Sequence, residues 1–325
     1  MRTRVFVKLW GSDMGGSAGG TFRYQTPTNL AKQVRRAEDD TTVAAFEAEL
    51  NSLVSDVLAS SNQRDVDLVR DRLAEVKTAL QGVIEGSFDQ LFGGSVAKHT
   101  YVDGLSDIDS LILLNGSDLE KNSPHEILGR LGNVVRANLR DVAEITTGQM
   151  AVTIRFNDGM VLQVLPAIKG QDGTLRVPSS RRDGWSHIDP EAFRAALTKR
   201  NQECGGKLVP TIKLAKSIVG QMPEAQRLSG YHVESLAIAA FRQYEGQKTT
   251  AAMLPTFFER SRDLVLSPIR DSTGQSVHVD AYLGDAGSVD RIAVGHVMGR
   301  IAKRMRNATA AGSAAQWRAI LDSDL

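Results

Sequence analysis

A short acidic pattern that runs directly into a buried strand constrains the fold of this chain more than any other feature. In the segment 94–114, GSVAKHTYVDGLSDIDSLILL, one residue separates Asp107 from Asp109, and a run rich in Leu and Ile follows. Alternate side chains of an extended chain leave the same face. The two carboxylates can therefore grip one or two Mg2+ ions together.

Upstream of the acids, Gly94 and Ser95 end a segment that we interpret as helix-like. A glycine at such a bend lets backbone N–H groups and a hydroxyl approach phosphate oxygens closely. Phosphoryl transfer to a hydroxyl needs metal ions that neutralise a triphosphate. Asp-x-Asp also occurs as a solvated turn, but the buried strand immediately after it favours a polymerase-beta-type nucleotide site.

The periodicity of apolar residues predicts helices in the first half and again beyond Trp185, with strands between them. A hairpin with its turn at Asn157 to Gly159 is expected over 150–168. Helices are expected over 42–60, 66–84, 124–139, 190–202, 207–222, 231–244 and 251–262. We therefore expect an α+β fold. The Gly-Ser and Asp-x-Asp pattern resembles that of polymerase-beta-type nucleotidyltransferases, and this resemblance implies such a core with a mixed sheet over 1–185, including N-terminal helices, and a helical lobe over 186–325 that closes the nucleotide cleft.

Composition excludes several classes of protein. No apolar stretch approaches the ~18 residues of a membrane-spanning helix, and a net charge of +1 argues against bulk nucleic-acid binding. Cys204 is the only cysteine, which excludes an intrachain disulfide and fits a cytoplasmic protein. The glycine-rich stretch Ser12 to Gly20 is interpreted as a flexible loop, because it lacks the G-K-[ST] ending of a phosphate-binding loop.

Further segments beyond the acidic pattern strengthen the interpretation as a nucleotide site. They are VLQVLPAI, GWSHIDPEAF, TIKLAKSI with LSGYHVESL, and SPIRDSTGQS. Together with the acidic pattern, and in this order from about Gly94 to Gln275, they resemble segments of the CD-NTases, the bacterial relatives of cyclic GMP-AMP synthase, and of the oligoadenylate synthases. The resemblance implies a metal-dependent nucleotidyltransferase that joins nucleoside triphosphates into a cyclic or linear oligonucleotide messenger in bacterial anti-phage defence. Its product would act on a separate effector protein.

The resemblance also implies roles for individual residues. Asp107 and Asp109 would be catalytic and would bind Mg2+ or Mn2+, and Ser95 with Gly94 would bind the triphosphate. Lys216 would reach a phosphate as a flexible point charge, and Tyr231 would stack on a base. Two simpler interpretations stay open: Lys216 as a solvated helix residue and Tyr231 as a packing residue.

One position departs from the family pattern. The strand before the Pro-Ala pair carries a third catalytic carboxylate in the family, and Gln163 occupies that position here. An amide oxygen can coordinate a metal but brings no charge and cannot act as a base, so the metal that activates the attacking hydroxyl should bind more weakly. Either a carboxylate from elsewhere, such as Asp158 or Glu144, replaces it, or the chain binds nucleotide without efficient transfer.

Another possibility concerns the molecule that accepts the nucleotide. Transfer of a nucleotide to a tRNA, a primer or a protein side chain is the alternative enzymatic function.

Arg181 and Arg182 could clamp phosphates, although an exposed basic pair explains them equally well. Four histidines show no metal-ligand spacing and receive no catalytic role: His99, His187, His232 and His278.

Overall fold

The structure is a computed structural model. It describes residues 27–60, 66–81, 84, 89–92, 108–179, 184–269 and 280–321. The chain divides into two compact units, Met1–Glu47 and Ala48–Leu325. The predicted division at Trp185 into a core and a helical lobe stays a prediction.

The boundary between the units falls inside the first helix, α1 (Pro27–Ser60). This helix begins at Pro27 rather than near residue 42, where the apolar periodicity begins. Proline suits the first position of a helix because its fixed φ is already helical and its missing N–H would be unpaired there. In the second unit, Leu50, Leu53 and Val54 of α1 are buried.

A mixed sheet forms the centre of the second unit, as expected for an α+β fold. Among the described residues it has seven strands, and five of them follow the order β1-β2-β5-β4-β3. β2 and β5 are parallel, whereas the other pairs along this path are antiparallel. These strands are β1 (Asp89–Phe92), β2 (Ile108–Leu113), β3 (Val142–Thr147), β4 (Val152–Phe156) and β5 (Val161–Lys169). Two short strands extend the sheet from β5: β6 (Leu175–Pro178) and β7 (Trp185–Ile188).

The segment just before Gly94 corrects one expectation. We interpreted it as helix-like, but Asp89 to Phe92 form β1, which pairs with β2 from Asp89 opposite Leu113 to Phe92 opposite Ser110. Four residues are too few to specify a helix by periodicity, and pairing with a neighbouring strand decides the local structure. A strand, rather than a helix, therefore ends two residues before Gly94.

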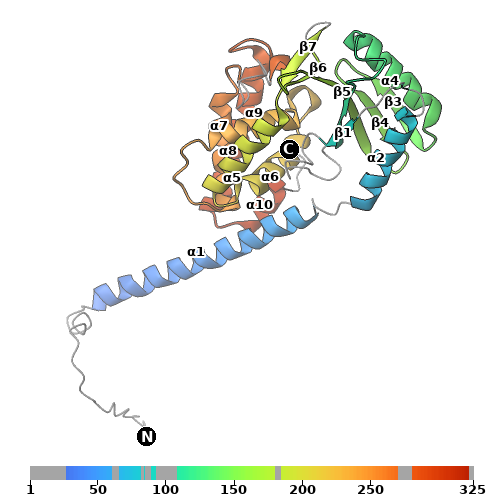
Figure 1. The fold of residues 1–325 in the computed structure, drawn as a ribbon. Coiled ribbons are helices and arrows are strands. Elements are labelled where there is room, and N and C mark those ends of the chain that lie inside the picture. The colour runs from blue at the N-terminus through green and yellow to red at the C-terminus, as the bar shows by residue number, and fades with distance from the viewer. Residues whose placement is uncertain are drawn as a thin grey trace, which may run out of the picture. The chain divides into compact units, whose positions relative to one another are not determined.

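Helices α2 (Val66–Gln81) and α4 (Pro124–Asn138) lie side by side against one face of the sheet (Figure 1). They bury Leu73, Val76, Ile127 and Leu131 in one core, and the sheet contributes its inward side chains. The main sheet residues in that core are Ile112, Val152, Ile154, Phe156, Leu162 and Val164. Each strand supplies alternate residues, so the intervening positions face the opposite side of the sheet.

Local sequence signals explain two of these elements. Ser123 caps α4 by accepting from the backbone N–H of Glu126, whose carboxylate accepts from the backbone N–H of Ser123 in return. This reciprocal pair satisfies two N–H groups that the helix start leaves open. The predicted hairpin is also confirmed: β4 and β5 are joined through a turn in which Gly159 has a φ of 89°, a conformation that favours glycine.

The second half of the chain is helical, as expected. Figure 1 shows these helices gathered into one group. They are α5 (Pro190–Glu203), α6 (Leu208–Gly220), α7 (Gly230–Ala240), α8 (Thr250–Leu264), α9 (Val289–Ala310) and α10 (Ala314–Leu321). At the crossing of α8 and α9, a Cβ built on Gly295 would lie 3.0 Å from the carbonyl oxygen of Arg262. The absence of a side chain at Gly295 thus permits the close approach of these two helices.

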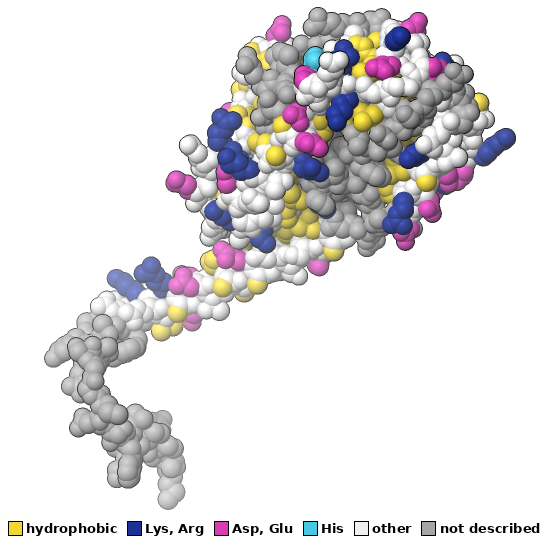
Figure 2. All heavy atoms as spheres, viewed as in Figure 1, with side chains coloured by type: hydrophobic (Ala, Val, Ile, Leu, Met, Phe, Trp, Pro, Cys, Tyr) yellow, Lys and Arg dark blue, Asp and Glu magenta, His cyan; other side chains and the backbone are white. Residues whose placement is uncertain are grey.

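None of the helices in the described part of the chain combines the length and apolarity needed to cross a bilayer. On the face seen in Figure 2, Lys and Arg side chains are interspersed with Asp and Glu, in keeping with a net charge of +1.

Candidate active site

The acidic strand and the strand that carries Gln163 are direct neighbours. Asp109 of β2 pairs with Gln163 of β5 in the parallel register. Adjacent strands lie about 4.8 Å apart, so the backbones at these two positions are as close as neighbouring strands allow. Gln163 is half-buried, while Leu162 and Val164 on either side of it are fully buried in the core. Position 163 therefore faces away from α2 and α4.

The row of positions that starts at Asp109 continues across the sheet with uncharged side chains. Gln163 pairs with Thr153 of β4, and Thr153 pairs with Thr146 of β3. Amide and hydroxyl oxygens can coordinate a cation or accept a hydrogen bond, but they supply no negative charge. Beyond Asp109, this row therefore brings no second carboxylate.

Asp158 does not replace the missing acid. Its carboxylate accepts from Arg72 of α2, at 2.8 Å from Nη2 and 3.1 Å from Nε, and from the Met160 amide at 2.9 Å. Burial alone would raise the pKa of Asp158, but the hydrogen bonds from Met160 and Arg72 outweigh it and hold this pKa below its ordinary value. Asp158 thus links the β4–β5 turn to α2 through its hydrogen bonds with Arg72.

Glu144 lies too far along the sheet to take the position. It belongs to β3, which is separated from β5 by β4, and it pairs with Arg155 in the register of the sheet. The Arg155 Nε and a Glu144 carboxylate oxygen are 3.8 Å apart, on half-exposed side chains. Two strand spacings amount to roughly 10 Å, so Glu144 is not a neighbour of Gln163.

The other predicted site residues outside the helical part lie outside the described residues. These are Gly94, Ser95, Asp107, the side chain of Asp109, Arg181 and Arg182. Within the part of the chain that is described, no group of three or more His, Cys, Asp or Glu side chains is arranged to hold a metal ion. The metal site stays a prediction that concerns Asp107 and Asp109.

Lys216 is buried rather than solvated. It lies on α6, its side chain is 5% exposed, and its Nζ is 2.8 Å from a carboxylate oxygen of Glu234 on α7, which is 1% exposed. A Cβ built on Gly230 would lie 3.3 Å from both Cε and Nζ of Lys216. The ammonium group therefore lies beside the first turn of α7, and the interpretation of Lys216 as a solvated helix residue is wrong.

Tyr231 also lies in that first turn. Its ring packs against the ring of Phe193 on α5, with centroids 4.6 Å apart and planes tilted by 40°. Phe193 is buried, whereas Tyr231 is half-buried. Tyr231 therefore packs against α5 and still reaches the surface.

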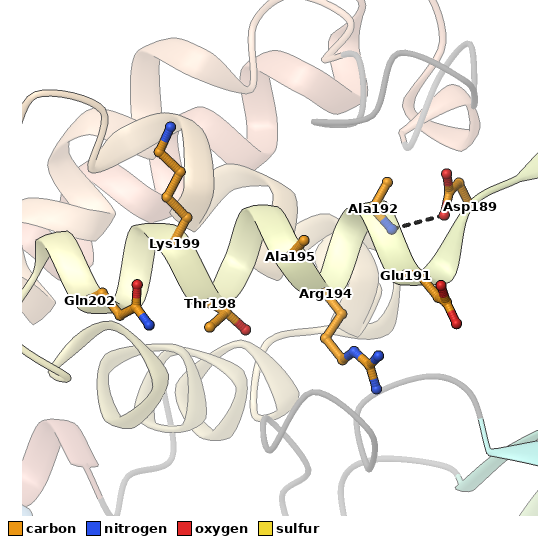
Figure 3. Close-up of a pocket in the computed structure, with 8 residues that line it drawn as sticks. All are labelled: Asp189, Glu191, Ala192, Arg194, Ala195, Thr198, Lys199 and Gln202. Carbon is orange, nitrogen blue, oxygen red and sulfur yellow. Dashed lines mark hydrogen bonds between the residues drawn. The ribbon is translucent and has the colours of Figure 1, made fainter.

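A hollow of about 650 Å³ lies along one side of α5, and eight residues of the Asp189 to Gln202 stretch line it (Figure 3). Asp189 is the N-cap of the helix and accepts from the Ala192 amide at 2.8 Å. The two cationic side chains, Arg194 and Lys199, point in opposite directions. They do not converge on one anion, so the described residues of this hollow do not by themselves form a phosphate site.

A polar cluster that the sequence pattern did not reveal surrounds His232. This residue is fully buried and contacts Tyr282, and Asp280 and Arg291 complete the cluster. Its members are far apart in sequence and follow no recognised spacing. The one usable hint is that His232 and Glu234 interrupt an otherwise apolar helix, where buried polar groups need partners.

The chain was compared with known protein families and structures. Residues 45–201 match the Second Messenger Oligonucleotide or Dinucleotide Synthetase domain, abbreviated SMODS. That range contains the acidic pattern, Gln163 and every strand of the described sheet. No curated protein matches the chain.

Several solved bacterial structures share the fold. CdnG of Bradyrhizobium diazoefficiens, a CD-NTase in complex with GTP, has a TM-score of 0.64 and 15% sequence identity, over 86% of this chain and 95% of that chain. DncV of Vibrio cholerae in its GTP-bound form has a TM-score of 0.58 and 12% identity, over 90% and 88%. CdnC of E. coli MS115-1 with ATP has a TM-score of 0.55 and 15% identity, over 87% and 98%. At these identities the likeness establishes the fold.

Proposed function

We propose that this chain, which carries a SMODS domain and has the CD-NTase fold, is a nucleotidyltransferase. It would join nucleoside triphosphates into a cyclic or linear oligonucleotide messenger. In each step the 3′-hydroxyl oxygen of one nucleotide forms a bond to the α-phosphorus of another. The bond from that phosphorus to the bridging oxygen breaks, pyrophosphate leaves, and the hydroxyl proton passes to solvent or a base.

The observation that carries this proposal is the position of Asp109 within the SMODS match. It lies on a central strand, in parallel register with the position at which the family pattern carries a third acid. Asp107 and Asp109 would hold Mg2+ or Mn2+, which supplies charge neutralisation of the triphosphate and activation of the attacking hydroxyl. Gly94 and Ser95 would bind phosphate oxygens.

The helical part would supply the rest of the nucleotide site. Lys216 lies beside the first turn of α7, and the N-terminus of a helix favours negative charge. Tyr231, in the same turn, has a partly accessible ring that can stack on a base. Related structures contain GTP or ATP, which supports a nucleoside triphosphate as the ligand here.

Gln163 favours a second candidate function. Because position 163 carries an amide instead of a carboxylate, the metal that activates the hydroxyl would be held weakly. The chain could then act as a nucleotide-binding regulator that transfers slowly or not at all. Such a regulator would work through a protein partner. In the catalytic case, the partner would be a separate effector that responds to the product.

Product analysis separates these possibilities. The purified chain would be incubated with each labelled nucleoside triphosphate, and with all four, in Mg2+ or Mn2+, and products resolved by size and mass. Short oligonucleotides with released pyrophosphate would support the messenger function, whereas label on tRNA or protein would contradict it. Thermal stabilisation by nucleotide without any pyrophosphate release would support the regulator instead.

A further inference from the structure

A buried ionic cluster lies outside the residues assigned above. Arg291 of α9 is fully buried, and its Nη1 donates to a carboxylate oxygen of Asp280 at 2.5 Å. The same guanidinium donates to the backbone carbonyls of Val265 at 3.0 Å, Gly284 at 3.0 Å and Asp285 at 3.1 Å. Because its donors are matched to acceptors, this buried arginine holds Asp280 in one place.

His232, a residue of α7, is the next member of the cluster. Its Nε2 lies 3.8 Å from the Asp280 carboxylate and has no hydrogen-bond partner among the described residues. Burial lowers the pKa of His232 to about 4, although the charge of Asp280 opposes this and that of Arg291 reinforces it. The imidazole is therefore neutral at neutral pH and carries one proton.

Tyr282 connects the His232 side chain to the backbone of Ser229, the residue before α7. Its hydroxyl oxygen accepts from the Ser229 backbone N–H at 3.1 Å and lies 2.8 Å from Nδ1 of His232. The Tyr282 hydroxyl thus bridges the Ser229 backbone and the His232 ring.

The cluster ends at the turn that presents the proposed nucleotide-binding groups. Ser229 is the N-cap of α7, and its hydroxyl accepts from the His232 amide at 3.2 Å. Gly230, beside Lys216, and Tyr231 follow directly. Tyr282 and His232 thus hold the residues on both sides of Gly230 and Tyr231.

We propose that Tyr282 and His232, backed by the pair of Asp280 and Arg291, are positioning residues that fix the first turn of α7 for nucleotide binding. This inference rests on the proposed function, because it assigns the turn a nucleoside triphosphate as ligand. A preorganised site loses less free energy on binding than one that must be ordered. Loss of the cluster should therefore weaken nucleotide binding more than it slows transfer.

The Tyr282 hydroxyl allows a clean test. Tyr282→Phe keeps the ring and removes only the hydroxyl group with its bonds to Ser229 and His232. The residue is 51% exposed. Tyr244→Phe is a matched control, because the Tyr244 hydroxyl donates to the Gln247 carbonyl at 3.0 Å, outside the cluster. Binding of ATP and GTP would be titrated for wild type and both variants, together with KM, kcat and the melting temperature without nucleotide.

We expect Tyr282→Phe to raise the dissociation constant and KM roughly ten-fold, with kcat within about two-fold, while Tyr244→Phe binds nucleotide as the wild type does. Equal affinity in all three proteins would overturn the inference, even if Tyr282→Phe melted earlier, because a structural role alone predicts that result. If the wild type binds nucleotide but does not transfer it, the proposed catalysis is contradicted. The comparison of nucleotide affinity between wild type and Tyr282→Phe then still tests the positioning role. A wild type that binds neither nucleotide would overturn both.

Discussion

Asp109 of β2 and Gln163 of β5 are in-register partners on adjacent parallel strands. The uncharged residue at 163 therefore directly adjoins the acidic strand rather than lying at a distant part of the sheet. Asp158 is bound by Arg72, and Glu144 lies two strands away. The charge missing at position 163 is not restored by either of the carboxylates that were candidates for it.

The first prediction follows from that missing charge. Gln163→Asp should lower the Mg2+ concentration for half-maximal pyrophosphate release roughly ten-fold, because a carboxylate adds charge to the metal ligands. Gln163→Asn, which shortens the side chain without adding charge, is the control and should bring no gain. An unchanged metal dependence in the Asp variant would show that position 163 does not face the metal.

The second prediction concerns Arg72, which is 8% exposed. Its guanidinium contacts Asp158, Glu75 and Asp141 and lies 4.5 Å from the ring centroid of Phe156. Arg72→Ala should lower the free energy of unfolding by about 2 kcal/mol, a value reduced because the acidic partners are partly exposed.

Urea denaturation would measure this loss. Arg70→Ala is the control on the same helix, because the pair of Arg70 and Asp67 is exposed and should contribute little. Equal effects of the two substitutions would show that the Arg72 contacts do not stabilise the fold.

The third prediction is a pH dependence from His232. Its pKa is about 4 in the folded protein and about 6.5 when unfolded, so below pH 6.5 the unfolded state binds the extra proton. Folded-state stability should therefore fall as the pH drops from about 6.5 to about 4, by up to roughly 3 kcal/mol. His232→Asn should lack this part of the loss. Parallel urea midpoints for the two proteins between pH 7 and pH 4 would argue against a buried neutral histidine.

The fourth prediction tests the crossing of α8 and α9. A Cβ at Gly295 would meet the Arg262 carbonyl oxygen at 3.0 Å and the Leu266 Cδ2 at 3.2 Å. Gly295→Ala should thus cost about 1–3 kcal/mol through overpacking. Gly129→Ala in α4 is the control: nothing lies within 4 Å of its Cβ, and alanine there should stabilise by about 0.5–1 kcal/mol. A stabilised Gly295→Ala protein would contradict the tight crossing.

Much of this architecture follows from local pattern. The hairpin of β4 and β5 was predictable because alternating apolar residues flank an Asn-Asp-Gly turn, and α4 because Ser123 and Glu126 precede a helical stripe. In contrast, β1 was misread because a four-residue strand takes its structure from pairing with β2. Helices α9 and α10 were not predicted at all.

The candidate site shows the same division. The sequence identified Asp107, Asp109 and Gln163 by spacing and resemblance, and the register now places positions 109 and 163 next to each other. It could not reveal that Glu234 pairs with Lys216, or that Tyr282 reaches Ser229, because these contacts depend on how separate helices pack. Long-range polar pairing leaves no periodic signal in a single sequence.

The central claim is that Asp107 and Asp109 support nucleotide transfer. Its most direct test compares pyrophosphate release and product mass for wild type, Asp107→Asn/Asp109→Asn and Glu144→Gln, each with all four nucleoside triphosphates and Mg2+ or Mn2+. We predict short oligonucleotide product from wild type and from Glu144→Gln, and none from the double variant. Undiminished product from the double variant would contradict the account.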